Sequence, residues 1–232
     1  MNKFSIVIPA FNEGDNLNIL IDEIINSVDR FKYKYEIIIV DDCSQDNTLP
    51  KIDNKIKKYG IVYLKNQVNL GQSSSIYNGI IKAKFSNILT IDADLQNDPR
   101  DINKLCNIYF SNEKFGLVAG IRKKRKDKYI KILSSKIANS IRSFILNDGC
   151  QDTGCSLKIF KKNIFLNFEF FTGIHRFLPA LFKNKNLLIE YVNVNHRVRL
   201  HGISNYGTFS RLLWGIRDLI KVKKMINKIQ DD

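Results

Sequence analysis

The chain has 232 residues, of which 44% are hydrophobic and 26% charged. This length and composition predict one folded globular domain and argue against an intrinsically disordered chain. The net charge of +14 favours an anionic partner, namely nucleic acid, a membrane surface or a phosphorylated substrate, unless an AT-rich genome has inflated the lysine content. No apolar run reaches the length of about 18 residues that a membrane-spanning helix needs.

Five apolar runs in the first half of the chain are predicted to be β-strands. Each run is continuous rather than alternating, a pattern typical of parallel strands that are covered on both faces. Turn-forming or acidic residues follow them. The runs span residues 4–10, 35–42, 60–64, 87–94 and 115–120.

Helical patterns lie between these runs. Apolar residues from Leu17 to Val28 recur at spacings of three and one, which predicts a helix with one buried stripe. Asp98 and Pro99 are typical of the N-cap and first position of a helix, which we expect to continue to about Phe110. Alternating strands and helices predict an α/β fold, in which a mostly parallel sheet carries helices on both faces.

The pattern changes after residue 120. Residues 121–128 form a basic loop, and an apolar stripe then predicts an amphipathic helix. The stripe consists of Ile130, Leu133, Ile137, Ile141 and Phe144. Residues 187–207 are predicted to be a strand followed by a basic loop that contains glycine.

The last segment, residues 208–232, is predicted to be a basic amphipathic helix. Its apolar stripe is predicted to include Phe209, Leu212, Leu213, Ile216, Leu219, Ile220, Ile226 and Ile229. No linker separates it from residues 1–207, so we expect it to belong to the same domain or to contact a membrane surface. Packing of the stripe on the protein's own core and packing on a membrane-embedded partner are the alternatives.

Three strand-end segments are expected to meet at one edge of the sheet, because ligands of such sheets bind outside the carboxyl ends of the strands. They are Pro9 to Glu13, Asp41 with Asp42, and Asp92 to Gln96. Carboxylates one residue apart, as in Asp92 and Asp94, can hold a hard divalent cation such as Mg²⁺ or Mn²⁺. Phosphate oxygens fill the open positions of such an ion, which makes a diphosphate a better leaving group.

These segments resemble glycosyltransferase family 2, whose members have the GT-A fold, a Rossmann-like nucleotide-diphospho-sugar transferase architecture. The resemblance covers nearly the whole chain, and its DADLQ and RxxGxS elements are similar to dolichyl- or polyprenyl-phosphate sugar transferases such as dolichyl-phosphate mannose synthase. The matching stretches are IVIPAFNE (6–13), IIIVDDCSQDNT (37–48), NLG (69–71), DADLQNDP (92–99), GIRKKRKD (120–127), DTGCSLKIFKK (152–162), HRFLPAL (175–181) and NHRVRLHGISNYG (195–207).

The resemblance implies a set of donor and metal contacts. The donor nucleotide would contact Pro9, Phe11, Glu13, Asp42 and Asp92. The metal, Mg²⁺ or Mn²⁺, would be held by Asp92, Asp94 and Gln96. For Asp41 a structural role is the alternative, for Asn69 and Gly71 a simple turn, and for Asp98 a helix cap rather than a ligand.

The acceptor is indicated partly by what the chain lacks. Family members that act on alcohols carry a Glu-Asp pair whose aspartate is the general base, but this region reads QDTGCS, and no QxxRW element occurs. Asp152 is an alternative base, although a cap or turn is the expected role. A phosphate acceptor is already an anion and needs cations to position it. The resemblance therefore implies an inverting transfer of a hexose, from a donor of the GDP-mannose or UDP-glucose type, to a polyprenyl or dolichyl phosphate.

Basic residues of the second half are the candidates for phosphate contacts. We expect Arg122, Lys136, Arg199 and Ser204 to bind the acceptor phosphate, and Asp94, Arg199 and Arg122 to be the catalytic residues. Asn205 replaces a lysine that is usual in the family, which could weaken phosphate binding. His175 is expected to make a structural hydrogen bond.

Two other readings of the sequence remain. A transferase of the same fold could act on a hydroxyl of a glycan or glycolipid, and a basic chain could be a nucleic-acid-binding module, although we expect no nucleic acid as a partner. The cysteines form no CxxC pair and no signal peptide precedes Phe4, so reduced thiols and a cytoplasmic enzyme, peripheral on the inner face of the membrane, are expected.

Overall fold

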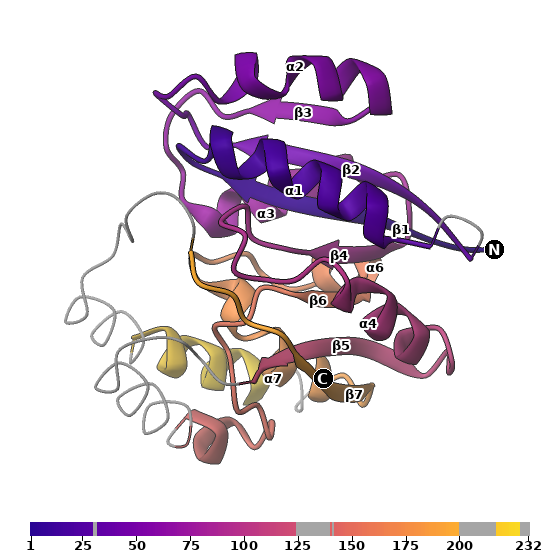
Figure 1. The fold of residues 1–232 in the computed structure, drawn as a ribbon. Helices are drawn as coiled ribbons and strands as arrows, with labels where there is room; N and C mark the ends of the chain where they lie inside the picture. The colour runs from indigo at the N-terminus through magenta and orange to yellow at the C-terminus, as the bar shows by residue number, and fades with distance from the viewer. Residues whose placement is uncertain (30–31, 124–139, 141, 200–216, 228–232) are drawn as a thin grey trace.

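The computed structural model describes residues 1–29, 32–123, 140, 142–199 and 217–227. They form a seven-stranded sheet in the order β3-β2-β1-β4-β6-β5-β7 (Figure 1). The strands are β1 (Asn2–Ala10), β2 (Tyr33–Asp41), β3 (Val62–Lys65), β4 (Asn87–Thr90), β5 (Phe115–Arg122), β6 (Lys158–Lys161) and β7 (Leu188–Val194).

The sheet is mostly parallel, as predicted. β1 pairs in parallel with β2 and β4, β2 with β3, and β5 with β7. β6 lies between β4 and β5 and is antiparallel to both. We did not predict β6, because its four residues, KIFK, carry a lysine at each end and show no continuous apolar run.

Helices cover both faces of the sheet, which confirms the predicted layers. They are α1 (Gly14–Ser27), α2 (Thr48–Tyr59), α3 (Gln72–Lys82), α4 (Asp101–Tyr109), α6 (Lys162–Leu166), α7 (Leu178–Lys183) and the 3-10 turn η1 (Ile174–Arg176). Residues 142–146 and 217–227 are also helical.

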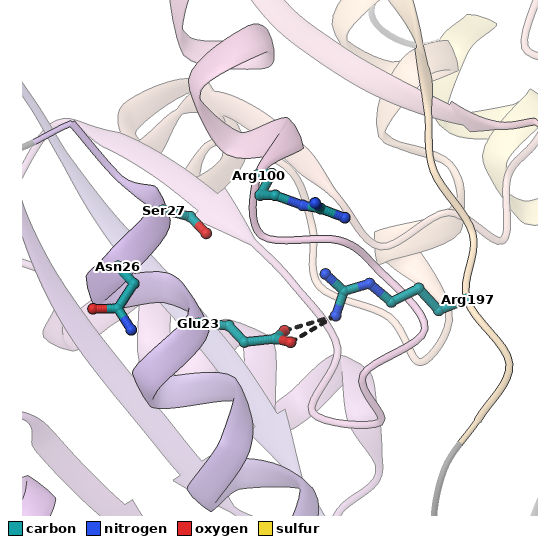
Figure 2. A pocket seen from close by; sticks show the side chains of 5 residues that line it. All are labelled: Glu23, Asn26, Ser27, Arg100 and Arg197. Atoms are coloured by element: carbon teal, nitrogen blue, oxygen red, sulfur yellow. Dashed lines mark hydrogen bonds and ion pairs between the residues drawn. The ribbon is translucent and has the colours of Figure 1, made fainter.

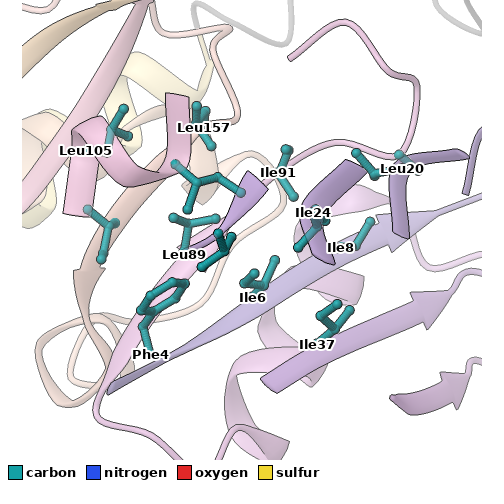
Figure 3. Packing of buried hydrophobic residues seen from close by; sticks show 14 of the residues in the cluster. Phe4, Ile6, Ile8, Leu20, Ile24, Ile37, Leu89, Ile91, Leu105 and Leu157 are labelled. Carbon is teal, nitrogen blue, oxygen red and sulfur yellow. The ribbon is translucent and has the colours of Figure 1, made fainter. Parts of the chain in front are cut away.

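Two hydrophobic cores explain why the apolar runs are continuous. Phe4, Ile6 and Ile8 of β1 pack against α1 and α4 in one core, while Val7 belongs to the second core on the opposite face (Figure 3). Successive side chains of a strand point to opposite faces, so a strand covered on both sides needs apolar residues at nearly every position. The second core includes residues of α3 and α7.

The C-terminal helical residues 217–227 pack on the protein itself. Val222 is fully buried and Ile226 is 3% exposed, both in the second core, and Leu219 packs against it. In this part of the helix the apolar stripe therefore faces the core, although Ile220, predicted on the stripe, is 54% exposed. Residues 209–216 of the predicted helix, including Trp214, lie outside the described residues.

Two other local predictions need correction. The helix α4 begins at Asp101, two residues later than an Asp98 cap predicts; Asp98 accepts the backbone N–H of Arg100 in the turn before the helix and also binds arginine side chains. Phe144, predicted on a buried stripe, is 89% exposed. The other members of that stripe lie outside the described residues.

Candidate active site

The loops that follow β1, β2 and β4 meet at the carboxyl edge of the parallel strands. Each loop contains one non-glycine residue with a positive φ: Asn12 at 56°, Cys43 at 65° and Leu95 at 62°. Such backbone is strained for an L-residue and persists only where surrounding contacts enforce it. Asn12 supplies such contacts, because its Oδ1 accepts the N–H of Gln45 at 2.8 Å and its own N–H donates to Ser44 Oγ at 2.8 Å. The first two predicted segments therefore lie together.

The adjacent carboxylates of Asp41 and Asp42 are buried and hold neighbouring loops. Asp41 accepts the backbone N–H of Ser44 at 2.8 Å and the hydroxyl of Tyr63. Asp42 accepts the side-chain amide of Asn66 at 2.7 Å and the backbone N–H groups of Leu70 and Gly71 at 2.9 and 2.7 Å.

These contacts show what the two carboxylates and the NLG segment do in the fold. Asp41 has the structural role that we kept as its alternative. Gly71 adopts φ 85° and Asn69 lies in the same turn, which the Asp42 carboxylate ties to the end of β2. Asp42, a predicted donor contact, therefore already uses three acceptor positions to shape the loop that leads into α3.

The acidic segment after β4 presents its polar side chains on one side. Ile91, Ala93 and Leu95 are buried, whereas the alternating positions 92, 94 and 96 are partly exposed. The buried Leu95 side chain anchors the segment in the first core. Asp94 Oδ1 accepts the backbone N–H of Gln96 at 3.1 Å. The three predicted metal ligands thus lie on the same side of one short segment.

Asp92 is held by residues from two other segments. Gln72, the first residue of α3, donates from Nε2 to Asp92 Oδ1 at 2.7 Å. The backbone N–H of Asp92 donates to Ser156 Oγ at 3.1 Å. Burial and the neighbouring Asp94 raise the pKa of Asp92 to about 6, although Lys158 and Arg122 act in the opposite direction. Two carboxylates that repel each other in this way favour a bound cation.

The residues fit a metal that completes its shell with substrate oxygens. Within the described residues no group of three or more His, Cys, Asp and Glu side chains is placed to hold a metal ion. Mg²⁺ is usually bound in enzymes by one or two carboxylates together with substrate phosphates. Asp92 and Asp94 supply two such carboxylates, so the site suits a metal that arrives with a diphosphate better than a permanently caged ion.

Arg199 lies at this acidic edge. Its Nη2 forms an ion pair with Glu13 Oε1, and Asn16 donates to Glu13 Oε2. Burial raises the pKa of Glu13, with Asp94 acting in the same direction and Asn16 and Arg199 opposing it. Glu13 is therefore close to both Arg199 and Asp94, so residues from the beginning, middle and end of the chain come together.

Arg122 is bound in a different way. Its Nε and Nη2 donate to the two oxygens of Asp152, each at 2.7 Å, and its backbone N–H donates to Asp152 Oδ2 at 3.2 Å. Both side chains are largely buried, with exposed fractions of 13% and 6%. Asp152 was expected to cap a helix or form a turn, and the structure shows it as the ion-pair partner of Arg122. Any contact of Arg122 with the acceptor phosphate would have to be made beside this pair.

The remaining predicted positions are Pro9, Phe11, His175 and three residues outside the described part of the chain. Pro9 is a buried residue of β1, and Phe11 follows the strand partly exposed. His175 Nδ1 lies 2.8 Å from Ser73 Oγ, which confirms the structural hydrogen bond, and burial lowers the pKa of His175. Lys136, Ser204 and Asn205 lie outside the described residues.

Gln72, Ser156 and Lys158 were missed from the sequence. Gln72 and Ser156 are common polar residues, and only their contacts with Asp92 distinguish them. Lys158 is 2% exposed, and burial lowers its pKa. A buried lysine is rare enough to be a signal, but its burial follows from β6, which was not predicted.

Comparisons with known proteins agree with this architecture. A family model described as Glycosyl transferase family 2 matches residues 5–168. The dodecaprenyl-phosphate galacturonate synthase of Rhizobium johnstonii is 33% identical over 225 residues, 95% of this chain and 66% of that protein. The undecaprenyl-phosphate 4-deoxy-4-formamido-L-arabinose transferase of Proteus mirabilis is 30% identical over 228 residues, 95% of this chain and 67% of that protein. The chain thus spans about two thirds of the length of these curated relatives.

Solved structures share the fold at lower identity. Glucosyl-3-phosphoglycerate synthase from Mycobacterium tuberculosis, in complex with Mn²⁺, uridine-diphosphate-glucose and phosphoglyceric acid, superposes with a TM-score of 0.72 at 17% identity. The match covers 97% of this chain and 80% of that one. A complex of the same synthase with Mg²⁺ and uridine-diphosphate gives a TM-score of 0.70 at 17% identity, covering 95% of this chain and 78% of that one.

Proposed function

The chain belongs to glycosyltransferase family 2 and has the GT-A fold, and from this we propose that it transfers a sugar from a nucleotide-diphospho-sugar to a polyprenyl phosphate. The names of its curated relatives, which concern dodecaprenyl and undecaprenyl phosphate, support this acceptor class. The observation that carries the proposal is the meeting of the Asp92–Asp94 carboxylates with the Glu13–Arg199 ion pair at one sheet edge. A metal-bound diphosphate needs the first pair, and an anionic acceptor needs a cation such as Arg199.

The proposed reaction is a direct displacement at the sugar. A phosphate oxygen of the lipid forms a bond to the anomeric carbon, and the bond from that carbon to the diphosphate oxygen breaks. The bonding electron pair leaves with the nucleoside diphosphate, and the anomeric configuration is inverted. Because the attacking phosphate is already an anion at neutral pH, no side chain has to remove a proton.

The residues divide into donor, metal and acceptor contacts. Asp92, Asp94 and Gln96 would hold Mg²⁺ or Mn²⁺, which when bound offsets the charge that develops on the diphosphate. Pro9, Phe11 and Glu13 would line the nucleotide side, with Asp42 shaping the adjacent loop. Arg199 and Arg122 would orient the lipid phosphate, and we assign Lys136 and Ser204 to the same group from the sequence motifs.

A hydroxyl acceptor is less well supported by the contacts. Such an acceptor needs a general base, and Asp152 was the candidate. Both of its oxygens accept hydrogen bonds from the guanidinium of Arg122, at 2.7 Å each. A carboxylate held in this way is stabilised as an anion and is a weaker base, so the phosphate acceptor remains the proposal.

The sugar need not be a hexose of the mannose or glucose type. One relative is named for galacturonate and the other for 4-deoxy-4-formamido-L-arabinose, so a uronic acid and a modified pentose join GDP-mannose and UDP-glucose as candidate donors. In the described residues no helix is long and apolar enough to cross a bilayer. Because the proposed acceptor is a lipid, we propose that the described domain meets it at a membrane surface.

A direct transfer assay tests the proposed function. The full chain is incubated with undecaprenyl phosphate in vesicles, Mn²⁺ and a panel of nucleotide sugars, and the lipid products are identified by mass spectrometry. We expect one donor to give a lipid-phosphate sugar with release of its nucleoside diphosphate. Asp94→Asn should abolish turnover without lowering the melting temperature, because Asp94 is partly exposed at the crevice. Full activity in EDTA, or transfer only to hydroxyl acceptors, would contradict the proposal.

A further inference from the structure

Arg197, which follows β7, joins two elements that lie far apart in the sequence. Its Nη1 donates to both oxygens of Glu23 on α1, each at 2.8 Å, and its Nη2 donates to Asp98 Oδ1 at 2.6 Å. Figure 2 shows Arg197 reaching across an open hollow of about 360 Å³ towards Glu23, with Arg100 on the same side. One guanidinium therefore bridges a helix and the end of the acidic segment.

The backbone around Arg197 is tied to the same acidic segment. Asn97 and His196 form an antiparallel bridge, and the N–H of Arg197 donates to the carbonyl of Gln96 at 2.9 Å. Because Gln96 is only two residues after Asp94, residues 195–197 are fastened to the predicted metal loop by main chain and side chain together.

The same segment delivers Arg199 to the start of α1. Two residues of extended chain cover about 6–7 Å, less than the roughly 15 Å between Glu13 and Glu23 along the helix, so the two arginine side chains span the rest. Arg197 binds Glu23 near the end of α1, and Arg199 binds Glu13 immediately before its first residue. The position of Arg199 beside Glu13 therefore depends on where residues 195–197 are fastened.

We propose that Arg197 is a positioning residue that holds Arg199 at the acidic edge by bridging Glu23 and Asp98. The role rests on the proposed function, in which Arg199 binds the acceptor phosphate. Arg197 itself lines the hollow between α1 and the turn before α4, where Glu23 and Asp98 hold its guanidinium, so we infer that it acts through Arg199 and not by contact with substrate (Figure 2).

Arg100 offers a matched control, because it binds the same Asp98 carboxylate as Arg197. Arg100 also binds Asp98, through Nε at 3.0 Å and Nη2 at 2.6 Å, and its side chain is 74% exposed. It makes these bonds within its own turn, whereas Arg197 connects Asp98 to the segment of Arg199. Arg100→Met therefore removes a cation from the same carboxylate and leaves residues 195–199 fastened.

A double-mutant cycle tests the proposal. Arg197→Met and Arg199→Ala should each lower transfer to lipid phosphate about ten- to a hundredfold, the usual cost of losing a charge-assisted contact. Because Arg197 acts through Arg199, the double variant should be no more than about threefold worse than Arg199→Ala alone. The KM for the donor should change little in Arg197→Met, Arg197→Lys should recover part of the loss, and Arg100→Met should keep wild-type turnover.

Hydrogen exchange provides a readout without turnover. Amides of residues 195–199 should exchange faster in Arg197→Met than in the wild type or in Arg100→Met, by more than the change in the free energy of global unfolding accounts for. If the wild type makes product, two results would overturn the positioning role. One is full activity of Arg197→Met, and the other is a transfer rate in the double variant that falls by the product of the two single losses. A wild type that makes no lipid-linked product would overturn the proposed function, and with it the acceptor role of Arg199.

Discussion

Gln72 donates a hydrogen bond of 2.7 Å to Asp92, so the first residue of α3 holds the first carboxylate of the acidic segment. The next residue, Ser73, accepts the backbone N–H of Gly173 at 2.7 Å and pairs with His175. The start of α3 thereby contacts the acidic edge on one side and the turn before α7 on the other.

The Gln72 contact predicts an effect on metal binding. Gln72→Ala frees Asp92 Oδ1 to rotate, and loss of a partner that orients a metal ligand typically costs about 10- to 100-fold in metal affinity. Calorimetric titration of Mn²⁺ in the presence of the nucleoside diphosphate measures this loss. Gln67→Ala is the control, because Gln67 is an exposed residue of the same loop. Equal Mn²⁺ affinity in all three proteins would show that the contact does not orient the site.

Asp98 predicts a stability change at acid pH. Burial alone would raise the pKa of Asp98, but hydrogen bonds and charge from Arg100 and Arg197 outweigh it and lower the value to about 2. An unfolded aspartate titrates near about 3.9, so the stabilisation is present above about pH 4 and is lost as the pH falls towards 2. The difference corresponds to about 2–3 kcal/mol in the free energy of unfolding.

Urea unfolding between pH 6 and pH 2 tests this expectation. Asp98→Asn should be less stable at pH 6 and should lose less stability on acidification than the wild type. Asp53→Asn removes an exposed carboxylate that pairs with Lys57 on α2, and such surface pairs contribute little. An Asp98 variant with the acid dependence of the wild type would contradict the assigned pKa.

Gly173 predicts a site that does not tolerate a side chain. Its φ is 105°, and an added Cβ would lie 2.6 Å from Asp218 Oδ2 and 2.8 Å from Arg176 Nη2. These two side chains form the 3.0 Å ion pair that ties the C-terminal helix to η1. We expect Gly173→Ala to lower the free energy of unfolding by about 1–3 kcal/mol through strain and the displaced pair.

A glycine control at Gly60 separates the cost of backbone strain from the cost of displacing the ion pair. Its φ is also positive, at 63°, but nothing lies within 4 Å of an added Cβ. Gly60→Ala should therefore show the cost of the backbone conformation alone, about 1 kcal/mol. Denaturant unfolding of both variants gives the comparison, and equal losses would mean that the contacts around Gly173 do not matter.

Two exposed lysines of the C-terminal helix predict binding to anionic membranes. Deleting this helix would remove the buried Val222 and Ile226 from the core, so point changes are the sharper test. Lys223 and Lys224 are exposed, and each lysine near an anionic surface contributes about 1 kcal/mol. Lys223→Gln with Lys224→Gln should lower co-sedimentation with anionic vesicles about thirtyfold in partition coefficient at low salt.

The control replaces two lysines at the far end of the sheet. Lys57 and Lys58 are exposed on α2, which lies on the opposite side of the molecule from the C-terminal helix (Figure 1). The variant Lys57→Gln with Lys58→Gln has the same net charge as the test variant and should sediment like the wild type. If both variants lose binding equally, the attraction depends on net charge and not on the helix.

The sequence alone was sufficient for the parallel strands and for the edge where the site lies. The runs 4–10 and 35–42 are nearly continuous in apolar residues because both faces of β1 and β2 are covered, and that pattern is visible without coordinates. Strand ends of a parallel sheet share one edge, so the acidic segment after β4 could be placed there from its position in the chain. The helix-cap signal of Asp98 was less complete, because it placed the start of α4 two residues early and gave no indication that Asp98 binds Arg197 across the fold.

Only the tertiary structure decided which charges are paired. Arg122, Arg197 and Arg199 look equivalent as basic residues, yet they bind Asp152, the Glu23–Asp98 pair and Glu13. The environment of Lys158 is a second example. The antiparallel strand β6 inserts between β4 and β5 and buries Lys158 near Asp92. Apolar periodicity is a property of neighbouring residues and can be read along the chain, whereas an ion pair depends on the distance between residues that only folding brings together.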